Sequence, residues 1–486
     1  MTSPRFRAAA ATAFAAALLA ACATPGGLEP RSTPAEPNAL QADRSLAGAP
    51  VAPAVWPSAD WWTRLGDPQL DALVAEALAD APGLRVARAR LDKARALALA
   101  ADAPRWPQIG IGADVSRQRF SRNGIFPPPI GGSSFTQYQL AANLGWDLDP
   151  WGKNRALYEA ALGQARAAEI DAFAARLLVS AGVAHAYIRL QSTFEQLDLA
   201  RRALEERQTT LRLTQQRVAA GLDSRVELKQ VETSVPAARA RVLQLEEQLA
   251  LGRNQLAALL GKGPDRGLAI ERPAAKPHQL ALPSTLPADL VGRRPDVVAQ
   301  RWRVEAARGD IAAAKAQFYP DVNLSALVGL QSIDLGKLME RGSSIPSAGA
   351  ALRLPLFDGG RLRGNLAAKD ADYDLAVEQY NQTLVDALRE VVDQLESLRS
   401  IAAQRGEAEA ALASAEEAYQ LALARYRAGL GGLLQVLIAE TTVLEQRSLA
   451  ADLRSRELDR GVDLVRALGG GFEEDKPMPV AQGRLQ

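Results

Sequence analysis

Few side chains in this sequence have the types and spacing that catalysis or metal binding needs. The 486 residues include two histidines, His185 and His278, and one cysteine, Cys22. The histidines lie far apart and neither has a cysteine at metal-ligand spacing. A nucleophile elbow, a phosphate-binding loop and an HExxH motif are all absent from the sequence. We therefore expect a protein that is not an enzyme and that uses no metal or dissociable cofactor.

Cys22 is the residue whose surroundings predict a covalent modification. Arg5 and Arg7 precede a short apolar run, and small residues lead to the sequence Leu-Ala-Ala-Cys22. A charged start, a short apolar stretch and small residues are typical of a secretory signal. The last four residues resemble the bacterial lipobox, which implies diacylglycerol and palmitate on Cys22. By the same resemblance, Ala23 implies sorting to the outer membrane, whereas the alternative is an incidental cysteine of the signal peptide.

The charge balance excludes one class of partner. Lysine and arginine total 57 and aspartate and glutamate total 56, so the formal net charge is +1. A nucleic-acid-binding protein needs a basic excess on one face. We expect no nucleic-acid partner.

The longest segments of the chain form an internal repeat. Residues 151–261 and 357–469 each contain a long heptad pattern, a glycine turn and a second heptad pattern that runs back. An outgoing arm of roughly 65 residues is about 100 Å long at the α-helical rise. We expect two long antiparallel helical hairpins, and an ordinary two-stranded coiled coil is the alternative.

Each long hairpin is preceded by a shorter helical pattern and by two segments in which apolar and polar residues alternate. Such alternation predicts strands with one apolar and one polar face. A small sheet covered by helices would satisfy this pattern, and so would a sheet whose apolar face meets lipid. Four strands cannot close a barrel, so the second explanation requires an oligomer. Eight strands from a dimer would have an interior filled by side chains, whereas twelve strands from a trimer have room for a channel.

The predicted organisation has six parts. Strands are expected at about 108–120 and 133–149 in the first repeat and at about 321–333 and 345–357 in the second. The parts are a signal peptide (1–21), a lipid-anchored tether (22–58), repeat 1 (59–260, with a helical hairpin at 151–260), an equatorial connection (261–288), repeat 2 (289–468, with a helical hairpin at 361–468) and a C-terminal tail (469–486).

The double repeat, the lipobox, the Trp61-Trp62 pair followed by Asp67-Pro68, and the Arg-Tyr-Arg-Ala-Gly429 turn together resemble the TolC-like outer-membrane efflux proteins, in their OprM/NodT lipoprotein branch. The resemblance covers residues from about 59 to 471. It implies a mainly α-helical protein in which four strands per protomer join into a twelve-stranded outer-membrane barrel of a homotrimer. The helices would then form a periplasmic tunnel in a Gram-negative cell.

The resemblance also implies partners and site residues. A periplasmic adaptor would dock at the turns Gly221-Leu222 and Gly429-Leu430 and connect the tunnel to an inner-membrane pump of the resistance-nodulation-division or major-facilitator type. Arg425 and Tyr426 match the family's tip residues and would brace the neighbouring helix, and a solvated arginine is the alternative for Arg425. Ile438 stands where relatives have an acidic residue, and Glu440 is the nearest carboxylate. The gate is therefore either ionic, through Glu440, or hydrophobic.

The implied function is a passive duct that exports drugs or other small molecules. Two alternatives remain open from the sequence. One is the outer-membrane duct of a type I protein secretion system. The other is a non-conducting periplasmic scaffold lipoprotein.

Overall fold

The structure is a computed structural model that describes residues 26–46, 56–277 and 292–474. The chain divides into two compact units. Unit 1 contains the described residues up to Pro34 together with Leu91–Ala168 and Gln300–Tyr380. Unit 2 contains Ala35–Arg90, the described part of Glu169–Ala299, and the described residues from Asn381 onward. Each unit draws on both sequence repeats, so the repeats are intertwined.

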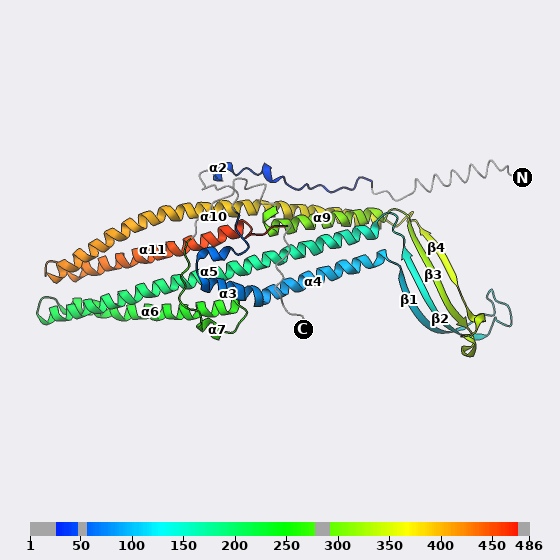
Figure 1. Cartoon of the computed structure of the whole chain (residues 1–486), viewed down its shortest axis with the longest axis horizontal. Helices are drawn as coiled ribbons and strands as arrows, with labels where there is room; N and C mark the ends of the chain where they lie inside the picture. The colour runs from blue at the N-terminus through cyan, green and yellow to red at the C-terminus, as the bar shows by residue number, and fades with distance from the viewer. Residues whose placement is uncertain (1–25, 47–55, 278–291, 475–486) are drawn as a thin grey trace. The chain divides into compact units, whose positions relative to one another are not determined.

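Unit 1 holds a four-stranded antiparallel sheet in the order β1-β2-β3-β4 (Figure 1). Its strands are β1 (Gln108–Arg119), β2 (Ser134–Asp147), β3 (Asp321–Ser332) and β4 (Ser347–Arg353). Each repeat contributes one hairpin, and the pairing of β2 with β3 joins the two hairpins.

The strand register collects the apolar residues on one face of the sheet. Ile111 faces Ala142, which faces Val328, and Leu144 likewise lies between Ile109 and Ala326. The same face continues into β4, where Val322 pairs with Leu352. Because side chains alternate along a strand, the intervening polar residues share the opposite face. The predicted two-faced strands are therefore confirmed, and they combine into one two-faced sheet.

β4 is shorter than the sequence predicts. We expected it to span about 345–357, but it ends at Arg353. Pro355 follows two residues later, and proline has no amide hydrogen to donate to a neighbouring strand. The strand ends before that position.

The helices follow the predicted repeat of short helices and long hairpins. The short ones are α3 (Pro68–Asp80), α4 (Pro82–Asp102) and α9 (Pro295–Ala316). The long hairpins are α5 (Lys153–Ala219) with α6 (Arg225–Leu259), and α10 (Arg361–Arg427) with α11 (Leu433–Ala467). Minor helices are α2 (Asp43–Leu46) and α7 (Asp265–Leu268). Among the described residues, no helix combines the length and the apolar character needed to cross a membrane.

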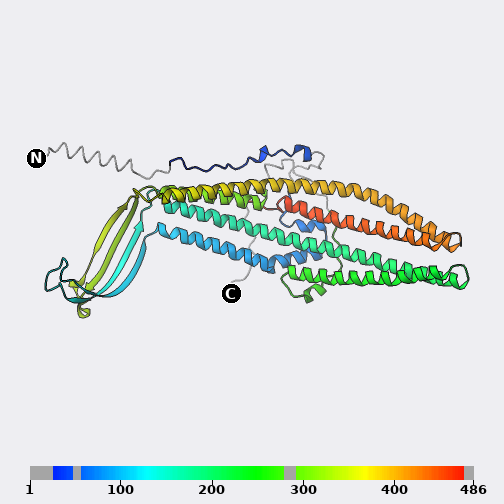
Figure 2. The ribbon, with the colours of Figure 1, turned by 180° about the vertical axis from the view of Figure 1, so that it is seen from behind.

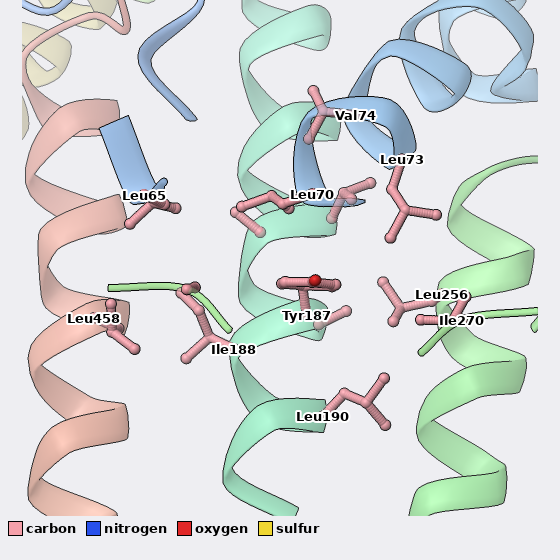
Figure 3. Packing of buried hydrophobic residues seen from close by; sticks show 14 of the residues in the cluster. Leu65, Leu70, Leu73, Val74, Tyr187, Ile188, Leu190, Leu256, Ile270 and Leu458 are labelled. Atoms are coloured by element: carbon pink, nitrogen blue, oxygen red, sulfur yellow. The ribbon is translucent and has the colours of Figure 1, made fainter. Parts of the chain in front are cut away.

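The core of unit 2 lies where α3 packs against α5, α6 and α11. Figure 3 shows Tyr187 and Leu190 of α5 among Leu70 and Leu73 of α3, with Leu256 of α6 beside them. All of these side chains are at most 1% exposed. Burial of large apolar side chains stabilises each by about 1.5–3 kcal/mol.

Asp67 connects three segments of this core. It caps α3, as the Asp-Pro sequence predicts, by accepting a hydrogen bond from the Gln69 amide at 3.0 Å. Its Oδ2 also accepts bonds from the Tyr187 hydroxyl at 2.6 Å and from the Ala274 amide at 2.7 Å. One carboxylate thus joins α3, α5 and the segment that follows α7.

Gly329 offers a test of the sheet register. A Cβ at Gly329 would lie 2.6 Å from Cβ of Ala141 on β2, whereas one at Gly145 meets nothing within 4 Å. Overpacking of this kind costs about 1–3 kcal/mol. We expect Gly329→Ala to lower the thermal midpoint of the purified protein by roughly 3 °C or more. Gly145→Ala, the matched control, should leave it unchanged, and equal midpoints for both variants would contradict the register.

Candidate functional site

Two tight turns close the long hairpins at the same end of the unit 2 helices (Figures 1 and 2). Gly221 and Gly429 take positive φ angles of 73° and 77°, which favour glycine over other residues. The next residue in each turn, Leu222 or Leu430, is 65% or 70% exposed. Each turn therefore presents an uncovered apolar side chain, while its role in docking an adaptor stays a prediction.

A buried polar cluster links the two turns. We call Thr214, Arg217, Asp223 and Tyr426 the tip lock. The Tyr426 hydroxyl donates to Oδ2 of Asp223 at 2.5 Å and lies 3.0 Å from Oγ1 of Thr214. Arg217 donates to both carboxylate oxygens of Asp223, at 2.9 and 3.1 Å. It also donates to the main-chain oxygen of Tyr426 at 2.9 Å.

The charges of Arg217 and Asp223 stabilise the tip lock. The guanidinium carbon of Arg217 lies 4.5 Å from the centroid of the Tyr426 ring, in cation–π contact. The bond from Arg217 holds the pKa of Asp223 below its usual value, with burial opposing. Burial and the bond to Asp223 raise the pKa of Tyr426. Asp223 is thus an anion and Tyr426 a neutral donor at neutral pH, the states that this geometry requires.

The two predicted tip residues have different surroundings. Tyr426 is fully buried within the tip lock. Arg425 is exposed and donates to the main-chain oxygen of Leu430 at 3.2 Å, inside its own turn. Within this chain, Tyr426 therefore connects the hairpins and Arg425 braces one turn.

Glu440 lies farther from the two turns than the tip lock does, and it joins α11 to α5. It is 2% exposed, and its Oε1 accepts a bond from Nε of Arg207 at 2.9 Å. Burial raises the pKa of Glu440, although Arg207 opposes the shift. Ile438 is 59% exposed on the same helix. The gate roles predicted for Glu440 and Ile438 stay predictions.

The Arg207–Glu440 pair belongs to a row of contacts between α5 and α11, which we call the cross-repeat row. Its other ion pairs join Glu206 to Arg447 at 3.6 Å and Glu195 to Arg454 at 3.5 Å. As the residue number rises along α5 it falls along α11, so the helices are antiparallel. The row fixes the first repeat against the second over much of their length.

His185 closes the cross-repeat row at its other end. Its Nδ1 lies 2.8 Å from Asp459, and its Nε2 lies 3.2 Å from Asp463. Burial alone would lower the pKa of His185, but the bonds to the two carboxylates outweigh it and raise the pKa to about 9. Both ring nitrogens are engaged, and within the described ranges no group of three or more potential ligands could hold a metal ion. The histidine acts as a cation between two carboxylates.

Comparison with known proteins identifies the family. The sequence profile described as "Outer membrane efflux protein" matches residues 73–262 and 286–470. The chain belongs to the outer membrane efflux protein family. As a member of this family, it acts at the outer membrane, and the predicted TolC-like resemblance is confirmed.

Individual relatives agree with this assignment. Fusaric acid resistance protein FusA of Burkholderia cepacia is 35% identical, over 96% of this chain and 88% of its own. Multidrug resistance outer membrane protein MdtP of Escherichia coli K12 is 33% identical, over 87% of this chain and 88% of its own. The structure of the outer membrane protein VceC of Vibrio cholerae matches with a TM-score of 0.81 at 39% identity, over 86% of this chain and all of its own.

Sequence reasoning found one member of the tip lock and missed three. Thr214, Arg217 and Asp223 lie around the first turn, whereas only Tyr426 of the second turn was singled out. Arg217 and Asp223 flank Gly221 with opposite charges, and this spacing was the available signal. Arg207 carried no comparable signal, because its partner Glu440 lies far away in the sequence of this efflux protein.

The His185 contacts predict a pH-dependent stability. Because the folded-state pKa is raised to about 9 from 6.5, the stabilisation is complete below pH 6.5 and is lost as the pH rises through 9. We expect the thermal midpoint of His185→Gln to fall below that of the unmodified protein by several degrees at pH 6. The gap should shrink towards pH 10, and a gap that stays constant from pH 6 to 10 would contradict a cationic His185.

Proposed function

We propose that this efflux protein is a passive homotrimeric duct. Its sheet would join two others in a twelve-stranded barrel in the outer membrane, and its long helices would form a periplasmic tunnel. A periplasmic adaptor would bind at the turns and connect the duct to an inner-membrane pump of the resistance-nodulation-division or major-facilitator type. The pump supplies the energy, and the duct carries out no chemical reaction.

The sheet is the observation that supports this proposal most directly. One of its faces is apolar across all four strands, and Ile109, Ile111 and Leu352 on it are 74%, 80% and 71% exposed. Within the described ranges, the outer edges of β1 and β4 have no partner strand. Unpaired strand edges are not tolerated in lipid, where each unsatisfied backbone group costs several kcal/mol. Pairing of β1 with β4 of the next protomer would satisfy both edges.

The names of two relatives support a proposal for the class of molecule that the duct carries. FusA is named for resistance to fusaric acid, and MdtP for multidrug resistance. Both names refer to small molecules. We therefore propose drugs or similar small molecules as cargo.

The tip lock is the proposed gate. It joins the first hairpin turn to the end of α10, so it holds the two hairpins of a protomer together at the tips. Hydrogen bonds to charged groups contribute roughly 1.5–3 kcal/mol each. Breaking them would let the hairpins separate and widen the duct.

Cys22 is the proposed membrane anchor. It lies outside the described residues, so its role rests on the lipobox alone. Acylation with diacylglycerol and palmitate would attach the mature chain to outer-membrane lipids.

Substitution of Asp223 tests the gate. Asp223→Ala removes the acceptor shared by Arg217 and Tyr426, so we expect single-channel conductance in planar bilayers to rise at least about twofold. The increase follows from the loss of charged hydrogen bonds at the tip.

Glu232→Ala is the matched control, because Glu232 is a carboxylate on α6 that pairs with Lys229 at the surface. It should conduct like the unmodified protein. Equal conductance for Asp223→Ala would reject the gate, while the absence of channels in every variant would reject the duct itself.

The anchor is tested by metabolic labelling. Cells grown with labelled palmitate should incorporate the label into the unmodified chain and not into Cys22→Ser. Label in the Cys22→Ser chain would show that another residue is acylated.

A further inference from the structure

The amino-terminal segment of the described chain lies against the first part of α10. Residues 26–36 are extended apart from the turn at Gly26 and Gly27, and they run beside α10 in both views (Figures 1 and 2). Leu28, Pro30 and Ser32 are half-buried, whereas the residues between them are exposed. This alternation is expected of an extended segment that rests with one face on a surface.

Side chains of α10 bind the main chain of this segment. The amides of Arg31 and Ser32 both donate to Oδ1 of Asp374, each at 2.8 Å. The amide of Ala35 donates to Oδ1 of Asn381 at 2.7 Å. A longer contact of 3.5 Å joins Arg363 to the main-chain oxygen of Gly26. Three side chains of one helix therefore hold the segment through its backbone.

The contacts to Asp374 and Asn381 have the same spacing along the amino-terminal segment as along α10. Asp374 and Asn381 are about 10 Å apart along the helix, and an extended chain covers about that distance between Ser32 and Ala35. Between Ser32 and Ala35 the segment and the helix thus run in step.

Asp370 opposes this docking. It lies one helical turn before Asp374 and is 6% exposed, and neither carboxylate oxygen has a hydrogen-bond partner. Burial raises the pKa of Asp370, Lys315 of α9 opposes that shift, and the charges of Asp374 and of Glu29 in the segment add to it. When ionised, Asp370 repels the segment that its neighbour Asp374 holds.

We propose that residues 26–35 form a strap that Asp374 and Asn381 fasten to α10 in a fixed register and that Asp370 weakens.

Hydrogen exchange of the full-length mature protein in detergent tests the strap. We expect Asp374→Ala to speed exchange of the peptide covering residues 28–36 by at least about fivefold. Asp374→Asn keeps the accepting oxygen and should restore most of the protection. Asp370→Asn removes the repulsion and should slow exchange at least about twofold.

Asp372→Ala is the matched control, since Asp372 is an exposed carboxylate of α10 that pairs with Lys369. It should leave the peptide unchanged, and exchange within α10 should be the same in all variants. Unprotected residues 28–36 in the unmodified protein, or no effect of Asp374→Ala, would overturn the strap. The measurement needs neither conductance nor acylation, so Cys22→Ser protein should give the same result even if the proposed anchor is wrong.

Discussion

The buried ion pair between Arg207 and Glu440 shows how the two repeats depend on each other. Most of the stability of helices such as α5 and α10 comes from packing of one face against other elements. The return helix of the second repeat supplies that packing for the outgoing helix of the first, and the polar contacts from His185 to Arg207 fix their register. Removal of one member of a buried pair leaves an uncompensated charge and costs about 3–5 kcal/mol. The row therefore favours one alignment of the helices over the shifted alignments that heptad patterns also permit.

The sheet depends on the same joining of the repeats. Each repeat contributes a β-hairpin that is too small to be stable by itself. The pairing of β2 with β3 joins the two hairpins into one four-stranded sheet. The apolar faces agree across this joint because a shift of one residue would turn every side chain of a strand to the other face. A two-faced sheet suits lipid on one side and water on the other, but its open edges would need partner strands in lipid.

Most of the fold could be predicted from the sequence, whereas most of the candidate site could not. Heptad and alternating patterns are local and extend over many residues, so they predicted both long hairpins and all four strands. Pro355 shortened β4, an effect that the alternating pattern alone did not reveal. The tip lock and the cross-repeat row join residues more than 200 positions apart, such as Thr214 and Tyr426. No local pattern reports such pairs, and for that reason Arg207 was missed and His185 had no predicted partner. Asp223 was missed although its charge and that of Arg217 flank Gly221 in the sequence.

Native mass spectrometry of the detergent-purified mature protein tests the central claim most directly. The account predicts a trimer, because eight strands from two copies would close a barrel filled by side chains, whereas twelve strands from three copies leave a channel. Each protomer should also carry the added mass of its acyl chains. A stable monomer would contradict the duct, because its sheet would keep both edges open and could not enclose a channel.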